Sequence, residues 1–114
     1  MDLSPEKYRQ DFEIVRLTAE QLIKDLEMFS ITIHFSGDPL HAYDELLQQL
    51  KPILKDLYKN HSSTFQSLLY RIDINERKFR QILSGENFID QLAEEVLQRE
   101  FQKILIRKFF SGKE

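Results

Sequence analysis

The sequence predicts an all-α protein, a compact bundle of four or five helices in which residues 1–114 form a single helical domain. Three observations lead to this prediction. Apolar residues recur at helical spacing along most of the chain, only three Gly and three Pro interrupt it, and a hydrophobic content of 41% is enough for a core. A length of 114 residues is typical of one domain.

The first predicted helix begins at Ser4-Pro5-Glu6-Lys7, with Ser as the N-cap and Pro at the first helical position. An apolar seam follows at alternating spacings of four and three residues, from Tyr8 through Phe12 to Phe29. Three further apolar residues widen the seam on both sides: Ile14, Leu17 and Ile23. A wide stripe is typical of a bundle helix that several neighbours cover, rather than of a two-stranded coiled coil.

Residues 30–39 change character, because Ile31, Ile33 and Phe35 alternate with polar residues before Gly37-Asp38-Pro39. Alternation over so few residues is a weak strand signal, and the sequence offers no partner strand. Two interpretations stay open. The segment is an extended connector with its apolar side chains against the bundle, or it is a last frayed turn of the first helix.

The second predicted helix covers Leu40 to Asn60, where apolar residues again recur at spacings of three and four. Asp38 is the expected N-cap and Pro39 the first helical residue. Because Pro52 lies inside this pattern and lacks a backbone N–H, we expect it to kink the helix or split it in two. The stretch 60–63 is expected to end this helix and to cap the next one.

Two shorter helices and a long terminal helix are expected after residue 63. The short helices carry the apolar residues Phe65, Leu68, Leu69 and Ile72, and then Phe79, Ile82 and Leu83. Asp73 or Asn75 is the expected cap between them, and Ser84-Gly85 stops the second. The terminal helix, 86–110, has a broad apolar face from Ile89 to Leu105.

Charged residues lie between apolar ones near the turn at residues 73–75. Arg71, Asp73 and Glu76 all fall in this stretch. We expect Arg71 to pair with Asp73 or Glu76 and so to fix the joint between the two short helices.

No motif in the sequence predicts catalysis, a cofactor or a metal site. The absence of Cys excludes disulfides, thiolate nucleophiles and Cys-containing zinc sites. The chain has no Gly-rich phosphate loop, no Gly-x-Ser-x-Gly and no His-Glu-x-x-His. His41, Asp44 and Glu45 share a helix face, but a bundle di-iron site also needs Glu-x-x-His pairs, which are missing. We therefore expect a protein that is not an enzyme and binds no cofactor.

The net charge of −3 is unevenly distributed, with −6 over residues 1–97 and +3 from Gln98 onwards. Cations near a helix C-terminus meet the negative end of its dipole, and a nucleic-acid-binding protein usually has a clearer basic surface. The first ten residues do not resemble a signal peptide, and no apolar stretch is long enough to span a membrane. We expect a cytoplasmic protein that contacts no membrane and is unlike a nucleic-acid binder.

The end of the terminal helix is the first candidate site. Ile106 and Phe110 project away from the side that carries Ile104 and Leu105, so residues 103–110 are apolar nearly all round. Either earlier segments of the chain cover these side chains or a partner does. The functional hypothesis is a non-enzymatic interaction or regulatory protein that binds a protein partner or a second copy, as in a homodimer. The residues assigned to that contact are Ile106, Arg107, Phe109 and Phe110.

The alternative hypothesis is a helix-turn-helix DNA-binding protein that uses residues 65–83. In that register Leu69 takes the position of the usual small residue, and Asp73 takes that of the turn glycine. The outward-facing residues of the recognition helix, which would contact phosphates and base edges, are then Arg77, Lys78, Arg80 and Gln81. The bulk of Leu69 and the acidic body of the chain count against this hypothesis.

Two short segments resemble known proteins. LLYRIDINE (Leu68–Glu76) and REFQKILIRKFF (Arg99–Phe110) are similar to segments of small, uncharacterised, all-helical bacterial proteins. The resemblance covers about a fifth of the chain and implies a helical fold and a bacterial cytosolic protein. Because no activity is assigned to such proteins, the resemblance carries over no functional residue.

Overall fold

The computed structural model describes residues 11–38 and 40–110, and this part of the chain forms five α-helices and no strand. The helices are α2 (Phe12–Glu27), α3 (Ala42–Asn60), α4 (Ser62–Ile72), α5 (Glu76–Leu83) and α6 (Phe88–Phe110). The predicted fold class, a compact all-α bundle, is confirmed.

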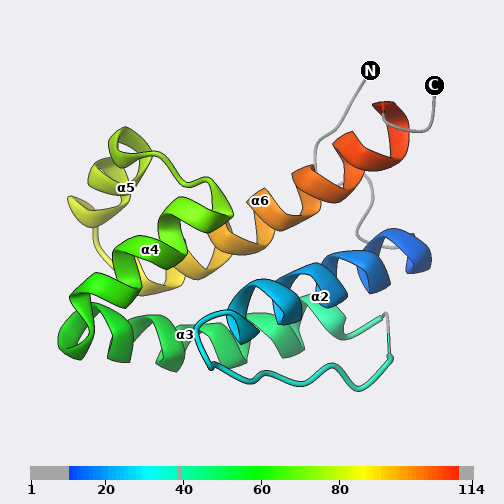
Figure 1. Cartoon of the computed structure of the whole chain (residues 1–114), viewed down its shortest axis with the longest axis horizontal. Coiled ribbons are helices and arrows are strands. Elements are labelled where there is room, and N and C mark those ends of the chain that lie inside the picture. Colours follow the sequence, from blue (N-terminus) through cyan, green and yellow to red (C-terminus); the bar gives the residue numbers. More distant parts are fainter. Residues whose placement is uncertain (1–10, 39, 111–114) are drawn as a thin grey trace.

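α6 is the central helix of the bundle, since α2 and α3 both pack along it (Figure 1). α2 and α3 run in the same direction and α6 runs in the opposite one, so the segment between α2 and α3 crosses back along the molecule (Figure 1). α4 packs on α3, α2 and α6, whereas α5 packs on the first part of α6. The longest helix therefore supplies the surface on which the other helices assemble.

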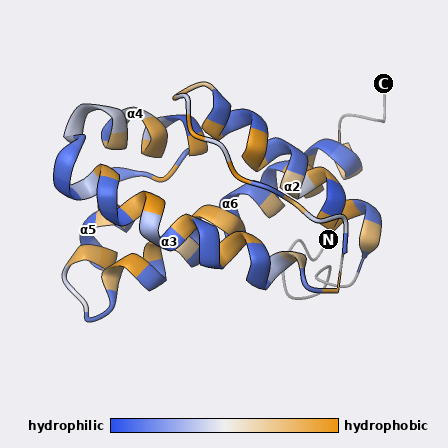
Figure 2. Ribbon diagram, turned by 90° about the horizontal axis from the view of Figure 1, so that it is seen from below, coloured by the Kyte–Doolittle hydropathy of each residue, from blue (hydrophilic) through white to orange (hydrophobic). Residues whose placement is uncertain are grey.

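The apolar face predicted for α6 is confirmed. Its buried apolar residues are Leu92, Ala93, Val96, Leu97, Phe101, Ile104 and Leu105, and Ile89 is partly buried. Hydrophobic and hydrophilic residues lie on different sides of the helices, as the helical spacing of the apolar residues requires (Figure 2). Complete burial of one leucine side chain stabilises the fold by roughly 1.5–3 kcal/mol, so this single face contributes much of the driving force for folding.

The start of α2 differs from the prediction. Asp11 has an extended backbone (φ −82°, ψ 105°), and its side chain accepts a hydrogen bond from the backbone N–H of Ile14 at 3.2 Å. Asp11 is therefore the N-cap, and the expectation of one helix running through this residue is wrong. The predicted start at Ser4 lies outside the described residues.

The segment between α2 and α3 is an extended connector, the first of the two interpretations. Ser30 has a positive φ of 61° just after α2, and the chain then runs out of the helix. Ile33 is buried, Ile31 and Phe35 are partly buried, and the alternating residues between them are exposed. The apolar side of the connector thus packs against the bundle, so burial rather than strand pairing explains the alternation.

α3 begins later than predicted and continues through its proline. Leu40 is outside the helix and 67% exposed, and Asp38 accepts from the backbone N–H of Leu40 in the turn before α3 instead of capping it. Pro39 lies outside the described residues. Pro52 does not split the helix, although the carbonyl of Gln48 loses the hydrogen bond that a backbone N–H at residue 52 would donate; both residues are exposed.

Of the two residues predicted to cap the start of α5, Asn75 is the one that does so, and Asp73 ends α4 instead. Asp73 takes the left-handed conformation (φ 71°, ψ 43°) at the end of α4. Asn75 then accepts from the backbone N–H of Lys78 at 2.7 Å and starts α5, while Ser84 ends it. The junction before α4 is tighter than expected, because His61 alone separates α3 from α4, and Ser62 and Ser63 are inside α4.

Candidate functional site

The C-terminal end of α6 contains the residues predicted to bind a partner. Ile106 and Phe110 each expose 49% of their surface, and Arg107 is exposed beside them. Phe109 is only partly exposed, because it packs against a small core cluster that includes Ile14 from α2. Three of the four predicted residues thus lie on the surface, and the fourth lies at the edge of the core.

Polar contacts hold this end of α6 against α2. The Arg107 guanidinium donates to the side-chain oxygen of Gln21 at 3.3 Å, and the Lys108 ammonium lies 3.0 Å from the carboxylate of Glu13. Arg107 and Lys108 therefore face polar and acidic residues of α2. Since this end of α6 also packs on α2 through Phe101, Ile104 and Leu105, Ile106 and Phe110 are half exposed on a packed helix.

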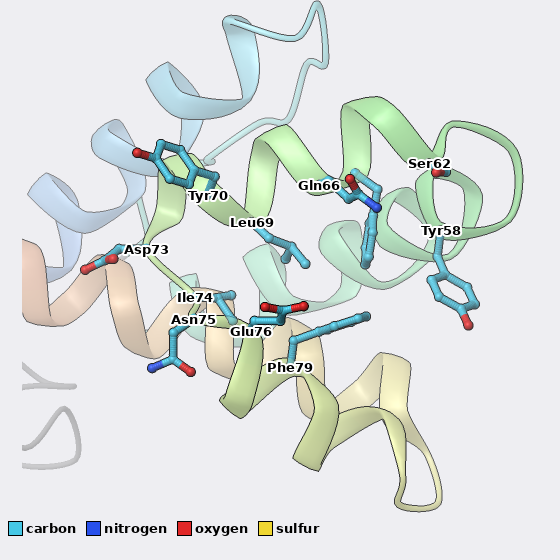
Figure 3. Close-up of a pocket in the computed structure, with 11 residues that line it drawn as sticks. Tyr58, Ser62, Gln66, Leu69, Tyr70, Asp73, Ile74, Asn75, Glu76 and Phe79 are labelled. Carbon is cyan, nitrogen blue, oxygen red and sulfur yellow. The ribbon is translucent and has the colours of Figure 1, made fainter.

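A groove of about 580 Å³ opens between α4 and α5, with the end of α3 beside it (Figure 3). Its floor is aromatic: the ring of Phe65 contacts those of Tyr58 and Phe79 edge to face, with centroid distances of 5.5 and 5.6 Å. Each such pair stabilises the structure by roughly 0.5–1.5 kcal/mol beyond its burial, so the floor forms without a ligand. The volume falls in the range of ligand-binding clefts.

The groove combines apolar walls with acidic groups. Among the described residues that line it, the charged ones are Asp73 and Glu76. Glu76 extends between Leu69 and Phe79, whereas Asp73 turns away (Figure 3) and pairs with Arg99 at 2.8 Å. Tyr70, at the rim, exposes 88% of its surface. The side chain of Glu76 is 83% exposed, and its carboxylate lies 3.9 Å from Arg80. An exposed aromatic ring and an exposed carboxylate beside apolar groups are features that a ligand carrying both apolar groups and a cation would complement.

The residues of the DNA-binding alternative are all on the surface of α5. Arg77, Lys78, Arg80 and Gln81 are exposed, and Asp73 has the left-handed backbone expected of the turn residue. However, a groove opens between α4 and α5, which meet at its floor through Phe65 and Phe79, and the bulky Leu69 lies in its wall (Figure 3). In a helix-turn-helix the two helices pack together across the turn, so the arrangement matches that motif in its turn and not in its packing.

A buried cluster of charged groups joins α2, α4 and α6. Asp25 is 1% exposed and Glu100 is fully buried. The carboxylate of Asp25 accepts from Arg71 at 3.1 Å and from Gln21 at 3.0 Å. The ammonium of Lys103 lies 3.4 Å from Asp25 and 3.2 Å from Glu100, and it also donates to the backbone carbonyl of Arg71 at 3.1 Å.

The two buried carboxyl groups differ in protonation. Burial and the hydrogen bond with Asp25 raise the pKa of Glu100 to about 8. Burial also acts against ionisation of Asp25, but the hydrogen bond from Glu100, the charge of Lys103 and the bonds from Gln21 and Arg71 together lower the pKa of Asp25. Neither oxygen of Glu100 accepts a hydrogen bond within the described part of the chain. A protonated Glu100 that donates to an ionised Asp25 satisfies both groups.

The partner predicted for Arg71 is therefore wrong. Arg71 reaches Asp25 on α2, whereas Asp73 pairs with Arg99, and Glu76 lies 3.9 Å from Arg80. The left-handed Asp73 turns the chain away from α4, so its side chain diverges from that of Arg71. The buried acids also went unpredicted, although both fall on apolar spacing: Asp25 follows Leu22 by three residues, and Glu100 precedes Ile104 by four.

His41 does not join Asp44 and Glu45 in a metal-binding group. Its Nδ1 lies 2.6 Å from the carboxylate of Asp38, and this hydrogen bond raises the pKa of His41 and lowers that of Asp38. Within residues 11–38 and 40–110, no three His, Asp or Glu side chains come together as metal ligands would. None of the helices described combines the length and the apolar character needed to cross a membrane.

The fold and its surface define the class: an all-α bundle with an apolar helix end on α6 and an aromatic groove between α4 and α5. No family model, curated protein or solved structure matches this chain. These two surfaces are the candidate functional sites of the chain.

Proposed function

We propose that the chain is a non-enzymatic protein–protein interaction or regulatory module that binds its partner through the C-terminal end of α6. One observation carries the proposal. Ile106 and Phe110 lie one helical turn apart on a packed helix, and each remains half exposed. Large apolar side chains presented in this way, with a cation beside them, are typical anchors of protein interfaces.

The size of the apolar anchor is modest. Completing the burial of two half-exposed large side chains contributes roughly 2–3 kcal/mol. This is less than association needs on its own, so further contacts around the two side chains must add to it. Arg107 is well placed to orient an acidic group of the partner, a protein or a second copy of the chain.

The double change Ile106→Ser with Phe110→Ser tests the proposal. We expect the variant to keep its helical circular-dichroism spectrum and to lose any self-association that light scattering detects in the wild type. Met28→Ser, which removes a side chain that is 60% exposed elsewhere on the surface, is the control. A double variant that no longer folds would show that these side chains belong to the core and would contradict the proposal.

The DNA-binding alternative retains one supporting observation, the exposure of Arg77, Lys78 and Arg80 on a single helix after a left-handed turn residue. It requires binding to duplex DNA that weakens steeply between about 50 and 200 mM salt. Fluorescence anisotropy with the wild type and with Arg77→Ala/Arg80→Ala measures this directly. Negligible binding by both proteins would contradict the DNA-binding hypothesis.

A further inference from the structure

We propose that the groove between α4 and α5 of one copy receives the C-terminal end of α6 from a second copy, so that chains associate head to tail. This inference rests on the proposed function and identifies its partner as the chain itself.

The two surfaces have complementary chemistry. The groove offers an aromatic floor, the apolar Leu69 in its wall and the carboxylate of Glu76 extending into it (Figure 3). The end of α6 offers two apolar side chains, Ile106 and Phe110, and the exposed cation Arg107. Because Arg107 and Phe110 are three residues apart, they are neighbours on the helix surface, so ring and guanidinium reach the same site together. Apolar groups would fill the groove while Arg107 faces the exposed carboxylate of Glu76 beside Arg80, which lies 3.9 Å from it.

The shapes also correspond. The groove is bounded by two helices that diverge from the turn at residues 73–75, which leaves an open channel (Figure 3). Ile106 and Phe110 are spaced as i and i+4, the spacing with which an amphipathic helix places side chains into such a groove. A volume of about 580 Å³ is sufficient for two large side chains.

The arrangement of the two surfaces excludes closure within one chain. α6 is continuous from Phe88 to Phe110, and its C-terminal end points away from α4 and α5 (Figure 1). The end therefore cannot enter its own groove. When two copies associate through two different surfaces, the pair still has one empty groove and one unbound helix end. Further copies can therefore add at both ends, unless the chain of copies closes into a ring.

The contact is small, and we expect it to be weak. One helix end in one groove is smaller than the interfaces of roughly 1,200–2,000 Å² that characterise stable complexes. Association is thus expected at protein concentrations from about 10 μM to about 1 mM. Over this range, the average mass of the wild type measured by sedimentation equilibrium should rise steadily and pass that of a dimer.

Two variants block the two surfaces separately. The groove variant is Gln66→Lys/Glu76→Lys, which places two cations at exposed positions that line the groove. The end variant is Ile106→Ser/Phe110→Ser. Each alone should remain a folded monomer. Glu94→Lys/Gln98→Lys makes the same change in net charge at exposed positions of α6 outside the groove and should associate like the wild type.

Mixing the two blocked variants tests the orientation of the contact. The groove variant keeps an intact helix end, and the end variant keeps an intact groove. An equimolar mixture should therefore form a dimer of one chain of each kind and grow no further. A symmetric contact between two helix ends cannot produce this result.

The other outcomes overturn the inference in distinguishable ways. A wild type that stays monomeric up to about 1 mM shows that the chain is not its own partner. A groove variant that associates like the wild type, while the end variant is a folded monomer, would show that the groove is not the docking surface. This result would contradict the inference and would agree with the proposed function. An end variant that folds and associates like the wild type would contradict both the head-to-tail contact and the proposed function.

Discussion

Glu100→Gln is expected to abolish a loss of stability that the wild type shows as the pH rises. Glu100 is fully buried, and its pKa is raised from 4.5 to about 8 in the folded protein. Between these values the folded state binds one proton more than the unfolded state. Its stabilising contribution is therefore complete below about pH 4.5 and is lost as the pH rises to about 8.

The size of the effect follows from the two pKa values. One pH unit across this interval changes the free energy of unfolding by about 1.36 kcal/mol, which sets an upper limit of about 5 kcal/mol. Rearrangement of the surrounding side chains and entry of water around an ionised Glu100 reduce this cost, and we expect a measured loss of about 2–4 kcal/mol. This is a large share of the roughly 5–15 kcal/mol that keeps a typical domain folded.

Urea unfolding at pH 5, 6, 7, 8 and 9, followed by circular dichroism, measures the effect. The amide that Glu100→Gln introduces would be neutral at every pH and would still donate an N–H to Asp25. The variant should therefore be more stable than the wild type by about 2–4 kcal/mol at pH 9 and similar to it at pH 5.

Two further variants separate Glu100 from other titrating groups. Glu94→Gln removes an exposed carboxylate of the same helix and should leave the pH dependence unchanged. The hydrogen bond with Asp38 raises the pKa of His41, so this exposed pair also loses stability as the pH rises above 6.5. His41→Gln removes the titrating group of the pair and so separates its contribution from that of Glu100. A wild type whose stability is constant from pH 5 to 9, or a Glu100→Gln variant with the same slope as the wild type, would refute the reasoning.

Two more changes probe the scaffold. Leu92→Ala removes a fully buried side chain in the N-terminal part of α6, and it should lower the free energy of unfolding by about 3–5 kcal/mol in urea titrations; a loss below about 1 kcal/mol would contradict the central role of this helix in the bundle. Asn75→Ala removes the 2.7 Å cap bond of α5 and should cost about 1 kcal/mol, whereas Asn75→Asp should retain most of the stability, and equal losses in both variants would argue against the cap.

The buried side of a segment was predictable where burial follows from the spacing of apolar residues alone. The apolar face of α6 and the alternation of Ile31, Ile33 and Phe35 both depend on which side chains turn inward, and periodicity encodes that directly. The start of α2 was not predictable in this way. The apolar seam continues through Phe12, but α2 begins only after Asp11, whose side chain accepts a hydrogen bond from the backbone N–H of Ile14.

The candidate sites were predictable only in part. Exposure of Ile106 and Phe110 follows from their position opposite the buried face, whereas the groove depends on how far α4 and α5 diverge after Asp73. Long-range pairing escaped prediction for a similar reason. Arg71 and Asp25 are 46 residues apart, and only the packing of α4 against α2 decides that they meet.

The central position of α6 affects how the chain folds during its synthesis. α2, α3 and α4 all precede α6 in the sequence, yet each packs against it. Until the 23 residues of α6 have left the ribosome, the apolar stripes of the earlier helices lack the surface that covers them. At a translation rate of about 5–20 residues per second, the synthesis of α6 alone takes about one to five seconds, far longer than a helical domain usually needs to fold. The nascent chain therefore exposes surfaces that molecular chaperones recognise, and its final collapse waits for α6.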